Sequence, residues 1–598
     1  MTGKQPSPNA DRPTSSRSTS RPANATWIAA TVFVFAFVAR SALSEAHGWR
    51  FTLFDDATIS MTYARTLSET GELVWFPGAP RVQGFTNTLW TLFMALCHLV
   101  TSSPDKVNFL VITSGTIILA ATAITIVKIS RFLEWSEKRT PSPAAHYAGA
   151  LVPLIYPTAF WTLRGMEVGL LAFFTVLLCS SALHSLDDST SLNGPRLRFT
   201  ASLSLIALLG VCTRLDFVVV VVPILFTTYI LRRDERRHLD ALFTFGLLIV
   251  GIFLVLGFQQ LYYDSPTPNT YALKVRGFPL TERAAVGLFH AFKVLPLLSA
   301  LLIFSWASRA VFRTSRSAQL TLLSTLILAS VLSYSVFVGG DAWESRLMIG
   351  RYVATALPLS LAAVILGLRF GVADSMKLRV AVVPSALLVL AICAEVIMTE
   401  ASTARFAAVS LLLLLSAVVV LTVLLSRSFA PVTSRSNSIT KALLLAPLLV
   451  ITSLIGLVDW AANGGLHIAD DRQMRERGHA LADLTAPEGT IATVWAGAPA
   501  YYSARPMIDL LGKSDPAISA ATPRGRFYPG HNKWDYSYSI GEKRPDIVHQ
   551  FWREAPSSQQ MKFWGYESYC YASAQVSFQL WVRADSRSVN RDLLAACK

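Results

Sequence analysis

The stretch Leu320–Val338 has the sequence LTLLSTLILASVLSYSVFV and contains no charged residue. A helix needs roughly 17–25 mostly apolar residues to cross the hydrocarbon core of a bilayer, and this stretch has that length. Runs of similar composition recur at Trp27–Leu43, Phe217–Leu231, Leu242–Leu256 and Ser410–Leu425. About fourteen segments are candidate spans by the same criterion. The sequence therefore predicts a mainly α-helical, polytopic membrane protein that lies in the lipid bilayer.

The overall composition supports this class and argues against a nucleic-acid partner. Of the 598 residues, 52% are hydrophobic and 15% are charged, whereas soluble proteins carry about 25% charged residues. The net charge is +15, but Lys and Arg gather in short patches between apolar runs. These patches are Arg232–Arg237, Arg309–Arg316, Lys377–Arg379 and Arg427–Lys441. Short cytoplasmic loops collect basic residues in this way, so the charge indicates topology.

The basic patches also predict the orientation of the chain in the plasma membrane. Residues 1–25 are polar and basic, which predicts a disordered cytoplasmic tail before a multi-spanning domain at 26–461. The first external loop is then 45–86, and 462–598 also lies outside the cytoplasm. Between residues 86 and 184 the alternation fails by one helix, so a segment there is short, re-entrant or merged with its neighbour.

The C-terminal segment 462–598 differs from the rest of the chain. It is rich in Pro, Gly, Trp and Tyr, and it has no apolar run long enough to span a membrane. Thr490–Trp495 and Val576–Arg583 alternate as strands do, which predicts a small α/β domain on the outer face. Cys570 and Cys597 fall in this domain and could form a disulfide there. The cysteines of the chain show no metal-binding spacing.

The first external loop carries two adjacent acids, Asp55 and Asp56. Ile59, Tyr63 and Leu67 follow at helical spacing, which predicts a helix that lies in the membrane interface and is capped by Asp55. Neighbouring carboxylates repel each other, so one can act as a base with a raised pKa, or both can hold a divalent cation such as Mg or Mn. The alternative is that one Asp caps the helix and the other is simply solvated.

Other polar and aromatic residues fall in or beside the predicted external loops. Trp75 and Asn87 lie in loops rich in Gly, Pro and aromatic residues, which suit either sugar stacking or an interfacial aromatic belt. Glu167, Arg214 and Asp216 lie at the edges of apolar runs. Ionisable groups at membrane depth are expensive, so these three are either functional or form internal ion pairs.

Two more loops bring cations to the outer face, where the positive-inside bias disfavours them. Lys274 and Arg276 follow Asn269 and Tyr271, and a phosphate ligand would explain their position. The loop that begins Gly339-Gly340-Asp341 is another cluster of acid, aromatic and basic residues. It ends at Arg346, with Arg351 close behind. Ordinary ion pairing is the alternative for both loops.

Taken together and in this order, these motifs resemble a group of GT-C glycosyltransferases. The resemblance rests on Asp55-Asp56 with Tyr63-Ala64-Arg65, and it runs from about residue 27 to about residue 550. The further segments are LVWFPGAPRVQGFTNTLWTL, WTLRGMEVGLLA, TRLDF, YYDSPTPNTYALK, GGD, YYSARPMIDLLGKSDPAI and PGHNKWDYSY. Within the group, the chain is most similar to actinobacterial terminal β-(1→2)-arabinofuranosyltransferases. It departs from the pattern at Thr62, where an Arg is usual, and at Gln83, where an acid is common.

The resemblance implies a GT-C helix bundle that moves arabinofuranose from a polyprenyl-phosphate donor to an envelope arabinan, as in arabinogalactan or lipoarabinomannan. By analogy with the group, Asp55 is the general base and Asp56 supports it or holds a metal. If the donor's anomeric configuration is kept, a carboxylate instead stabilises or traps the sugar cation. The predicted phosphate-binding residues are Lys274, Arg276 and Arg346. The predicted acceptor and sugar contacts are Trp75, Asn87, Glu167, Arg214, Asp216, Asn269, Tyr271, Asp341, His531 and Trp534.

Two other functions are compatible with parts of this pattern. An enzyme of the same architecture could transfer another sugar or use a protein acceptor such as a pilin. A transporter or lipid flippase would be favoured by acids near helix midpoints and by inverted internal repeats. The acids of this chain instead cluster in the predicted external loops, and its two halves show no visible symmetry.

Overall fold

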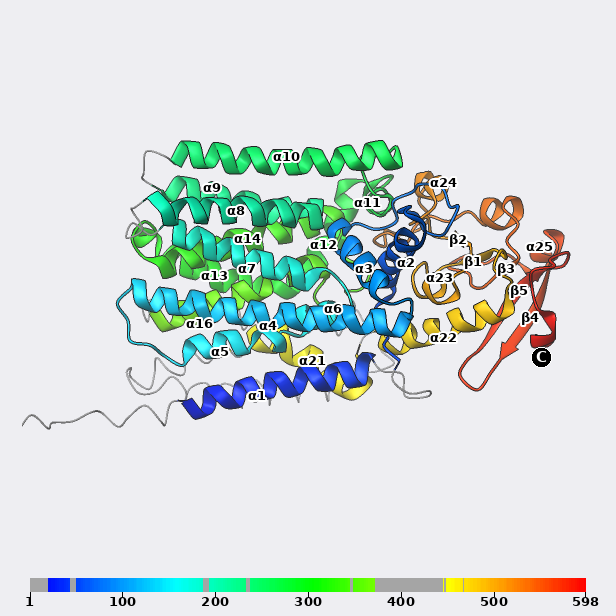
Figure 1. Cartoon of the computed structure of the whole chain (residues 1–598), viewed down its shortest axis with the longest axis horizontal. Helices are drawn as coiled ribbons and strands as arrows, with labels where there is room; N and C mark the ends of the chain where they lie inside the picture. The colour runs from blue at the N-terminus through cyan, green and yellow to red at the C-terminus, as the bar shows by residue number, and fades with distance from the viewer. Residues whose placement is uncertain are drawn as a thin grey trace, which may run out of the picture.

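The computed structural model describes residues 20–42, 50–186, 193–232, 237–344, 348–370, 445, 448–465 and 467–597. Figure 1 shows two parts joined end to end, a long bundle of helices and a C-terminal domain that contains the strands. The predicted fold class, a mainly α-helical membrane bundle with a small α/β domain, is confirmed. The predicted spans and patches at 371–444 lie outside the described residues, as does Arg346.

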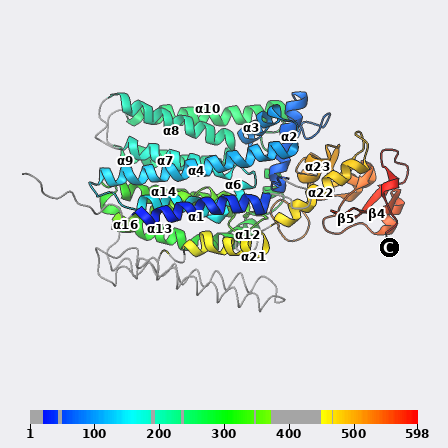
Figure 2. The same ribbon diagram turned by 60° about the horizontal axis from the view of Figure 1, so that its bottom comes forward.

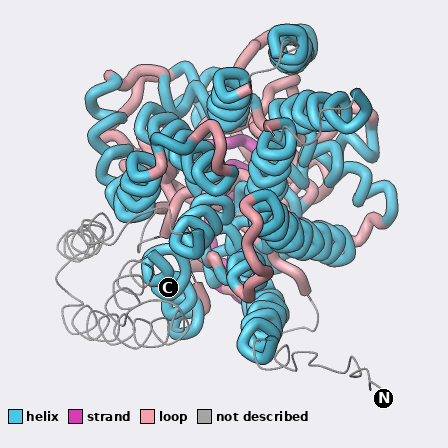
Figure 3. Tube along the Cα trace, turned by 90° about the vertical axis from the view of Figure 1, so that its left-hand side faces the viewer, coloured by secondary structure: helices cyan, strands magenta, loops and turns pink. Residues whose placement is uncertain are grey.

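Most of the described helices form the bundle. They are α1 (Ser20–Phe37), α2 (Asp55–Thr70), α3 (Thr88–Val100), α4 (Pro104–Ser136), α5 (Ala144–Ala150), α6 (Tyr156–Leu163), α7 (Val168–Ser185), α8 (Asn193–Thr213), α9 (Val218–Leu231), α10 (Arg237–Tyr263), α11 (Asn269–Val275), α12 (Leu280–Ala291), α13 (Leu295–Ala307), α14 (Arg316–Val338), α15 (Arg351–Ala354), α16 (Leu357–Phe370) and α21 (Ile455–Asn463). Helix α1 begins inside the predicted tail. Figures 2 and 3 show the long helices of this set, such as α1, α4, α8 and α10, packed along one common direction.

Six helical stretches in the described ranges are long and apolar enough to cross a membrane. They are Asn24–Ala42, Pro104–Ser136, Val168–Ser185, His238–Tyr263, Leu280–Ala307 and Arg316–Val338. Helix α10 is apolar on all sides and exposes large side chains such as Phe253 and Leu254. A helix of this kind is stable when lipid covers its outer face. The chain is therefore a multi-pass membrane protein.

The helix count that fails between residues 86 and 184 has a structural explanation. Helix α3 is short for a membrane span, and α4 begins beside the C-terminal domain, where Asp105 pairs with Arg475. The far end of α4 meets the start of α14 through Glu137 and Ser315. The chain returns through two short helices, α5 and α6, so residues 144–163 supply a broken pass between α4 and α7.

The C-terminal domain is built on a five-stranded mixed sheet in the order β2-β1-β3-β5-β4. Its elements are α22 (Ile468–Leu484), β1 (Ile491–Thr493), α23 (Ala498–Ser503), β2 (Met507–Asp509), α24 (Pro516–Ala520), β3 (Ile547–Val548), α25 (Ser558–Phe563), β4 (Tyr566–Ala572) and β5 (Ser577–Arg583). Strand β1 is parallel to both β2 and β3, with Ile491 opposite Met507 and Ile547. Strands β4 and β5 form an antiparallel hairpin. The disulfide that the sequence left open is present and joins Cys570 to Cys597.

Helix α2 lies at the junction of the two parts and not on a lipid-facing surface. Its residues are mostly buried, and Ile59 and Tyr63 pack with Leu481 and Leu484 of the C-terminal domain. The helical spacing of Ile59, Tyr63 and Leu67 predicted the helix correctly. The partner of its apolar face differs from the prediction, because a domain more than 400 residues further along the chain covers it.

Candidate functional site

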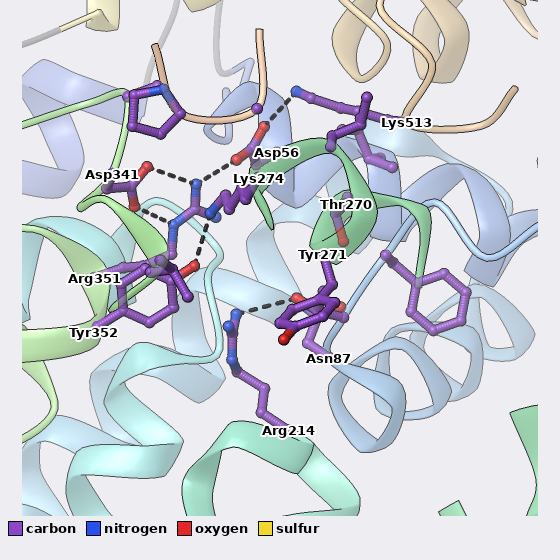
Figure 4. A pocket seen from close by; sticks show the side chains of 18 of the residues that line it. Asp56, Asn87, Arg214, Thr270, Tyr271, Lys274, Asp341, Arg351, Tyr352 and Lys513 are labelled. Carbon is purple, nitrogen blue, oxygen red and sulfur yellow. Dashed lines mark hydrogen bonds and ion pairs between the residues drawn. The ribbon is translucent and has the colours of Figure 1, made fainter. Parts of the chain in front are cut away.

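A cavity with an empty volume of about 830 Å³ lies where the bundle meets the C-terminal domain. It is lined by the start of α2, the loop before α3, helix α11, the segments around Asp341 and Arg351, and two loops of the C-terminal domain. It brings together these predicted site residues: Asp56, Asn87, Arg214, Asp216, Tyr271, Lys274, Asp341 and His531. Figure 4 shows several of them pointing into one space from separate elements. A concave space in which a few polar side chains converge is typical of a small-molecule site.

Arg351, the first residue of α15, is the central cation of a set of ion pairs on the cavity wall. Its guanidinium donates to Asp341 Oδ2 from Nε at 2.5 Å and to Asp56 Oδ2 from Nη2 at 2.6 Å. Lys513 Nζ lies 3.0 Å from the other carboxylate oxygen of Asp56. Figure 4 shows this chain of contacts from Asp341 through Arg351 and Asp56 to Lys513. Lys513 belongs to the loop before α24, so the C-terminal domain completes the site.

These pairs keep the carboxylates of Asp56 and Asp341 ionised. Burial by itself would raise the pKa of Asp56, but Lys513 and Arg351 outweigh it and hold that pKa well below its usual range. The pKa of Asp341 is lowered to about 2, because the attraction of Arg351 and Lys274 exceeds the effect of burial. Opposite charges within a few ångströms have this effect. In this arrangement both groups are fixed negative charges at neutral pH, and Asp56 becomes a useful base only if substrate displaces one of its cations.

A second charged group lies deeper, at the end of the cavity nearest the bundle. Arg214 donates from Nη1 to Glu167 at 2.7 Å and from Nη2 to Asp216 at 2.6 Å. Asn87 donates to the remaining oxygen of Glu167 at 2.8 Å and accepts a hydrogen bond from Ser60 of α2. The prediction left open whether these ionisable residues are functional or simply paired. They are paired with one another, and Glu167 lies behind Arg214.

Lys274 is the cation of this cavity that lacks a carboxylate partner in the described part of the chain. Its Nζ donates to the Tyr352 hydroxyl at 2.7 Å and lies 5.1 Å from the centre of that ring. Helix α11 carries the side chain into the cavity, where it is half-buried. An ammonium with these contacts keeps donor capacity for an anion, and phosphate oxygens are strong acceptors. The predicted role of Lys274 fits this position.

Asp55 and Asp56 point in different directions, although they are adjacent. Asp55 does not line the cavity; its Oδ1 accepts from the Ala498 amide at 2.7 Å, in the C-terminal domain. Burial raises the pKa of Asp55 to about 6, against the lowering effects of Lys513 and of the Ala498 amide. Asp55 is also not the helix cap. Phe54 occupies the cap position, and Asp471 of α22 accepts from the Asp55 amide at 3.1 Å.

The contacts of Asp55 and Asp56 do not fit a divalent cation held between them. Both oxygens of Asp56 already face cationic groups, and Asp55 is turned toward the C-terminal domain. A hard cation needs several oxygen ligands around one point. Within the described ranges, no group of three or more His, Cys, Asp or Glu side chains could hold a metal ion. The sequence left open whether these two acids hold a Mg or Mn ion, and in this structure their carboxylates do not converge on one point.

Several other predicted site residues lie away from the cavity. Trp75 and Trp534 are 4% and 2% exposed and belong to hydrophobic cores, so neither ring is open to a sugar. Asn269 begins α11 and donates its backbone amide to Gln83. Arg276 caps the other end of α11 and is exposed outside the cavity. His531 does line the cavity, where burial and Lys513 lower its pKa to about 4.

The prediction missed three residues that shape the cavity: Arg351, Tyr352 and Lys513. Arg351 was noted after the GGD segment, but no role was assigned to it. Lys513 lies in the segment IDLLGKSDPAI, whose basic residue could have drawn attention. Neither can be paired with Asp56 from sequence alone, because 295 and 457 positions separate them.

A smaller apolar cavity of about 350 Å³ adjoins the charged one. It shares Arg214, Asp216 and Tyr352 with the larger cavity, and its other walls include Val219 of α9 and Val331 of α14. The combined space is therefore charged around the ion pairs of Arg214 and Arg351 and apolar where α9 and α14 line it. Such a combination suits an amphipathic ligand with a charged head and a hydrocarbon chain.

The structure resembles ArnT from Cupriavidus metallidurans. The apo form matches with a TM-score of 0.55 at 13% identity, over 95% of this chain and 99% of that one. The form bound to undecaprenyl phosphate gives a TM-score of 0.54 at 13% identity, over 96% and 100%. The archaeal oligosaccharyltransferase AglB from Archaeoglobus fulgidus gives a TM-score of 0.45 at 11% identity, over 95% and 75%.

Comparisons at the level of sequence give little more. Residues 466–587 match a domain of unknown function, DUF8728. No curated protein sequence matches the chain. The chain thus shares the fold of ArnT over nearly the full length of both proteins.

Proposed function

We propose that the protein is a membrane glycosyltransferase that takes its sugar from a polyprenyl-phosphate donor. The observation that carries the proposal is the joined cavity, in which Lys274 and two carboxylates lie next to an apolar space inside the bundle. A lipid-linked sugar has the matching parts: a hydrocarbon chain, a phosphate and a sugar ring. The fold supports the same conclusion, because ArnT has been solved with undecaprenyl phosphate bound.

In this proposal the charged residues divide the work of glycosyl transfer. Lys274, with Arg214 behind it, binds the phosphate and stabilises the charge that develops as the C1–O bond to phosphate breaks. The acceptor hydroxyl forms the new bond to C1 and loses its proton. Asp56 takes this proton if phosphate binding draws Lys513 or Arg351 away from it. Otherwise Asp56 remains ionised and stabilises or traps the positive charge at C1 of the sugar, and the departing phosphate takes the proton of the acceptor hydroxyl.

The more specific proposal is that arabinofuranose is transferred to an envelope arabinan on the outer face of the plasma membrane. It is supported by the ordered motifs that resemble the arabinofuranosyltransferases. The basic patches support the matching topology, with a cytoplasmic N-terminus and the cavity and C-terminal domain outside.

The test is transfer of radiolabelled arabinofuranose from decaprenyl phosphate to a synthetic arabinan acceptor by the purified protein. We expect the wild type to transfer the label and Asp56→Asn to lose at least about a hundredfold in rate. Asp55→Asn is the matched control, since it changes the neighbouring acid outside the cavity, and we expect a much smaller loss. Circular dichroism and the melting temperature check that each variant is folded.

Two results would count against this proposal. No transfer by folded wild type would remove arabinan synthesis and direct the assay to other lipid-linked sugars and to protein acceptors. Equal losses in the two variants would show that Asp56 has no special role. The anomeric configuration of the product then separates the two roles of Asp56, because a base gives inversion and a covalent carboxylate intermediate gives retention.

A further inference from the structure

A second polar cavity, with an empty volume of about 860 Å³, shares no lining residue with the first. It lies between three elements that are distant in sequence: the start of α4, one face of α22 and the turn that joins β4 to β5. Asp105 comes from α4, Arg475 and Glu476 come from α22, and Tyr571 comes from the hairpin. None of these residues takes part in the proposed transfer site.

Arg475 is the most deeply buried charged group of this cavity, with 2% of its side chain exposed. Its Nη2 pairs with Asp105 at 3.0 Å, and its guanidinium lies over the ring of Tyr502. Its Nε and Nη1 have no hydrogen-bond partner in the described part of the chain. A buried donor without an acceptor costs about 1–3 kcal/mol, and such a group in a native protein calls for a bound water, ion or ligand.

Further unpaired polar atoms accompany these donors on the same helix. Glu476 Oε1 and His479 Nε2 are also buried without a partner among the described residues. Burial, with Arg475 and Arg50 nearby, lowers the pKa of His479 to about 4. The ring is therefore neutral at pH 7 and has one nitrogen that accepts. The cavity thus offers N–H donors beside oxygen and nitrogen acceptors.

The charges on the cavity wall argue against an anionic ligand. Asp105, Glu476 and Asp483 supply three carboxylates, whereas Arg50 and Arg475 supply two cations. A phosphate would therefore meet a wall with a net negative charge. A hydroxyl group both donates and accepts, so neighbouring hydroxyls of a sugar match mixed donors and acceptors. Aromatic residues such as Tyr571 often pack against the apolar face of a bound ring.

We propose that this second cavity binds a carbohydrate chain through its hydroxyl groups. If the function proposed above holds, the chain is the part of the acceptor glycan that is remote from the transferred sugar. That identification rests on the proposed function, whereas carbohydrate binding itself does not. A second contact of this kind would hold a long acceptor near the transferase cavity and would leave a short acceptor unaffected.

The direct test is binding of an arabinofuranosyl hexasaccharide and of mannohexaose to the full chain in detergent, measured by isothermal titration calorimetry. We expect at least one of them to bind the wild type. Its dissociation constant should rise at least tenfold in Arg475→Lys and in Glu476→Met, since each removes unpaired polar atoms from the cavity. The matched control is Glu567→Met, which removes a half-exposed carboxylate of β4 outside the cavity and should leave the affinity unchanged.

Affinities equal to the wild type in both cavity variants, or no binding of either hexasaccharide, would overturn the proposal. The unpaired atoms would then be satisfied by buried water. In an active enzyme, Glu476→Met should raise KM for a long arabinan acceptor and leave kcat and the KM of a disaccharide acceptor unchanged. Cavity-dependent binding by a chain that transfers no sugar would contradict only the proposed function.

Discussion

At the residue scale, the cavity between the bundle and the C-terminal domain is defined by which of its charges are paired. Arg351 is held by Asp56 and Asp341, whereas Lys274 contacts the hydroxyl and ring of Tyr352. Removing one member of a buried ion pair leaves the other charge uncompensated, so paired residues are poor sites at which to separate binding from folding. Lys274 permits that separation, because its loss leaves no carboxylate unpaired.

Lys274→Met should therefore weaken binding of the donor without unfolding the protein. A hydrogen bond to a charged group contributes about 1.5–3 kcal/mol, which corresponds to roughly a tenfold to hundredfold rise in KM for the lipid-phosphate donor. The melting temperature should stay close to that of the wild type. Arg276→Met is the matched control: it removes an exposed cation from the end of the same helix and should change neither quantity. If Lys274→Met and Arg276→Met raised the donor KM equally, Lys274 would not be the residue that binds the donor phosphate.

The raised pKa of Asp55 makes a separate prediction about pH. A carboxyl group whose folded pKa is about 6, above the ordinary Asp value of 3.8, binds its proton more tightly in the folded state. Stability from this group is therefore greatest below pH 4 and is lost as pH rises toward 6, by roughly 3 kcal/mol in total. In Asp55→Asn that part of the pH dependence should disappear, as measured by melting temperature between pH 4 and 7. If the melting temperature of Asp55→Asn depended on pH as that of the wild type does, the raised pKa of Asp55 would be contradicted.

At the scale of secondary-structure elements, the start of α2 is fixed by residues from both parts of the molecule. Arg164, which is fully buried after α6, donates to Asp471 of α22 at 2.6 Å and to the backbone carbonyls of Thr52 and Leu53. Asp471 in turn accepts from the amide of Asp55. This buried contact fixes the position of α2, the helix that carries Asp56. The C-terminal domain therefore supplies Lys513 to the cavity and, through Asp471, also positions Asp56.

Asp471→Ala should destabilise the protein by about 3–5 kcal/mol, because it leaves Arg164 buried without its counter-charge. The double variant Arg164→Met/Asp471→Leu should recover part of that loss, since it removes both charges. Asp470→Ala is the matched control, because Asp470 is exposed and its pair with His467 lies at the surface. Melting temperature in detergent measures all three. Similar melting temperatures for the two single variants would exclude a special role for the buried pair.

At the scale of the whole molecule, the two parts were predictable to different degrees. Long apolar runs such as Leu320–Val338 report spans directly, because a lipid-facing helix is apolar on every side. The divergence of Asp55 and Asp56 was not predictable, since adjacent helical side chains differ in direction by about 100° and either could face a site. Trp75 and Trp534 show a related limit: an aromatic residue fits a core as well as a sugar, and only packing decides which.

The disulfide joins the end of the described chain to strand β4. It closes a loop of 27 positions, for which the chain-entropy relation gives a contribution of about 3–4 kcal/mol. Cys570→Ser/Cys597→Ser should lower the melting temperature, and the KM for the donor should stay unchanged because neither residue lies near Lys274. A large change in donor KM would show that the hairpin influences the transferase cavity.

The ion pair between Asp56 and Lys513 has a consequence for the order of biosynthesis. The ribosome produces Asp56 early and Lys513 only after the bundle has been made. During that interval the nascent protein already contains Asp56, Arg351 and Lys274, but the wall of the cavity that the C-terminal domain supplies is missing. A chain released before Lys513 is added would therefore carry Asp56 with Arg351 as its one remaining cation partner within the described ranges.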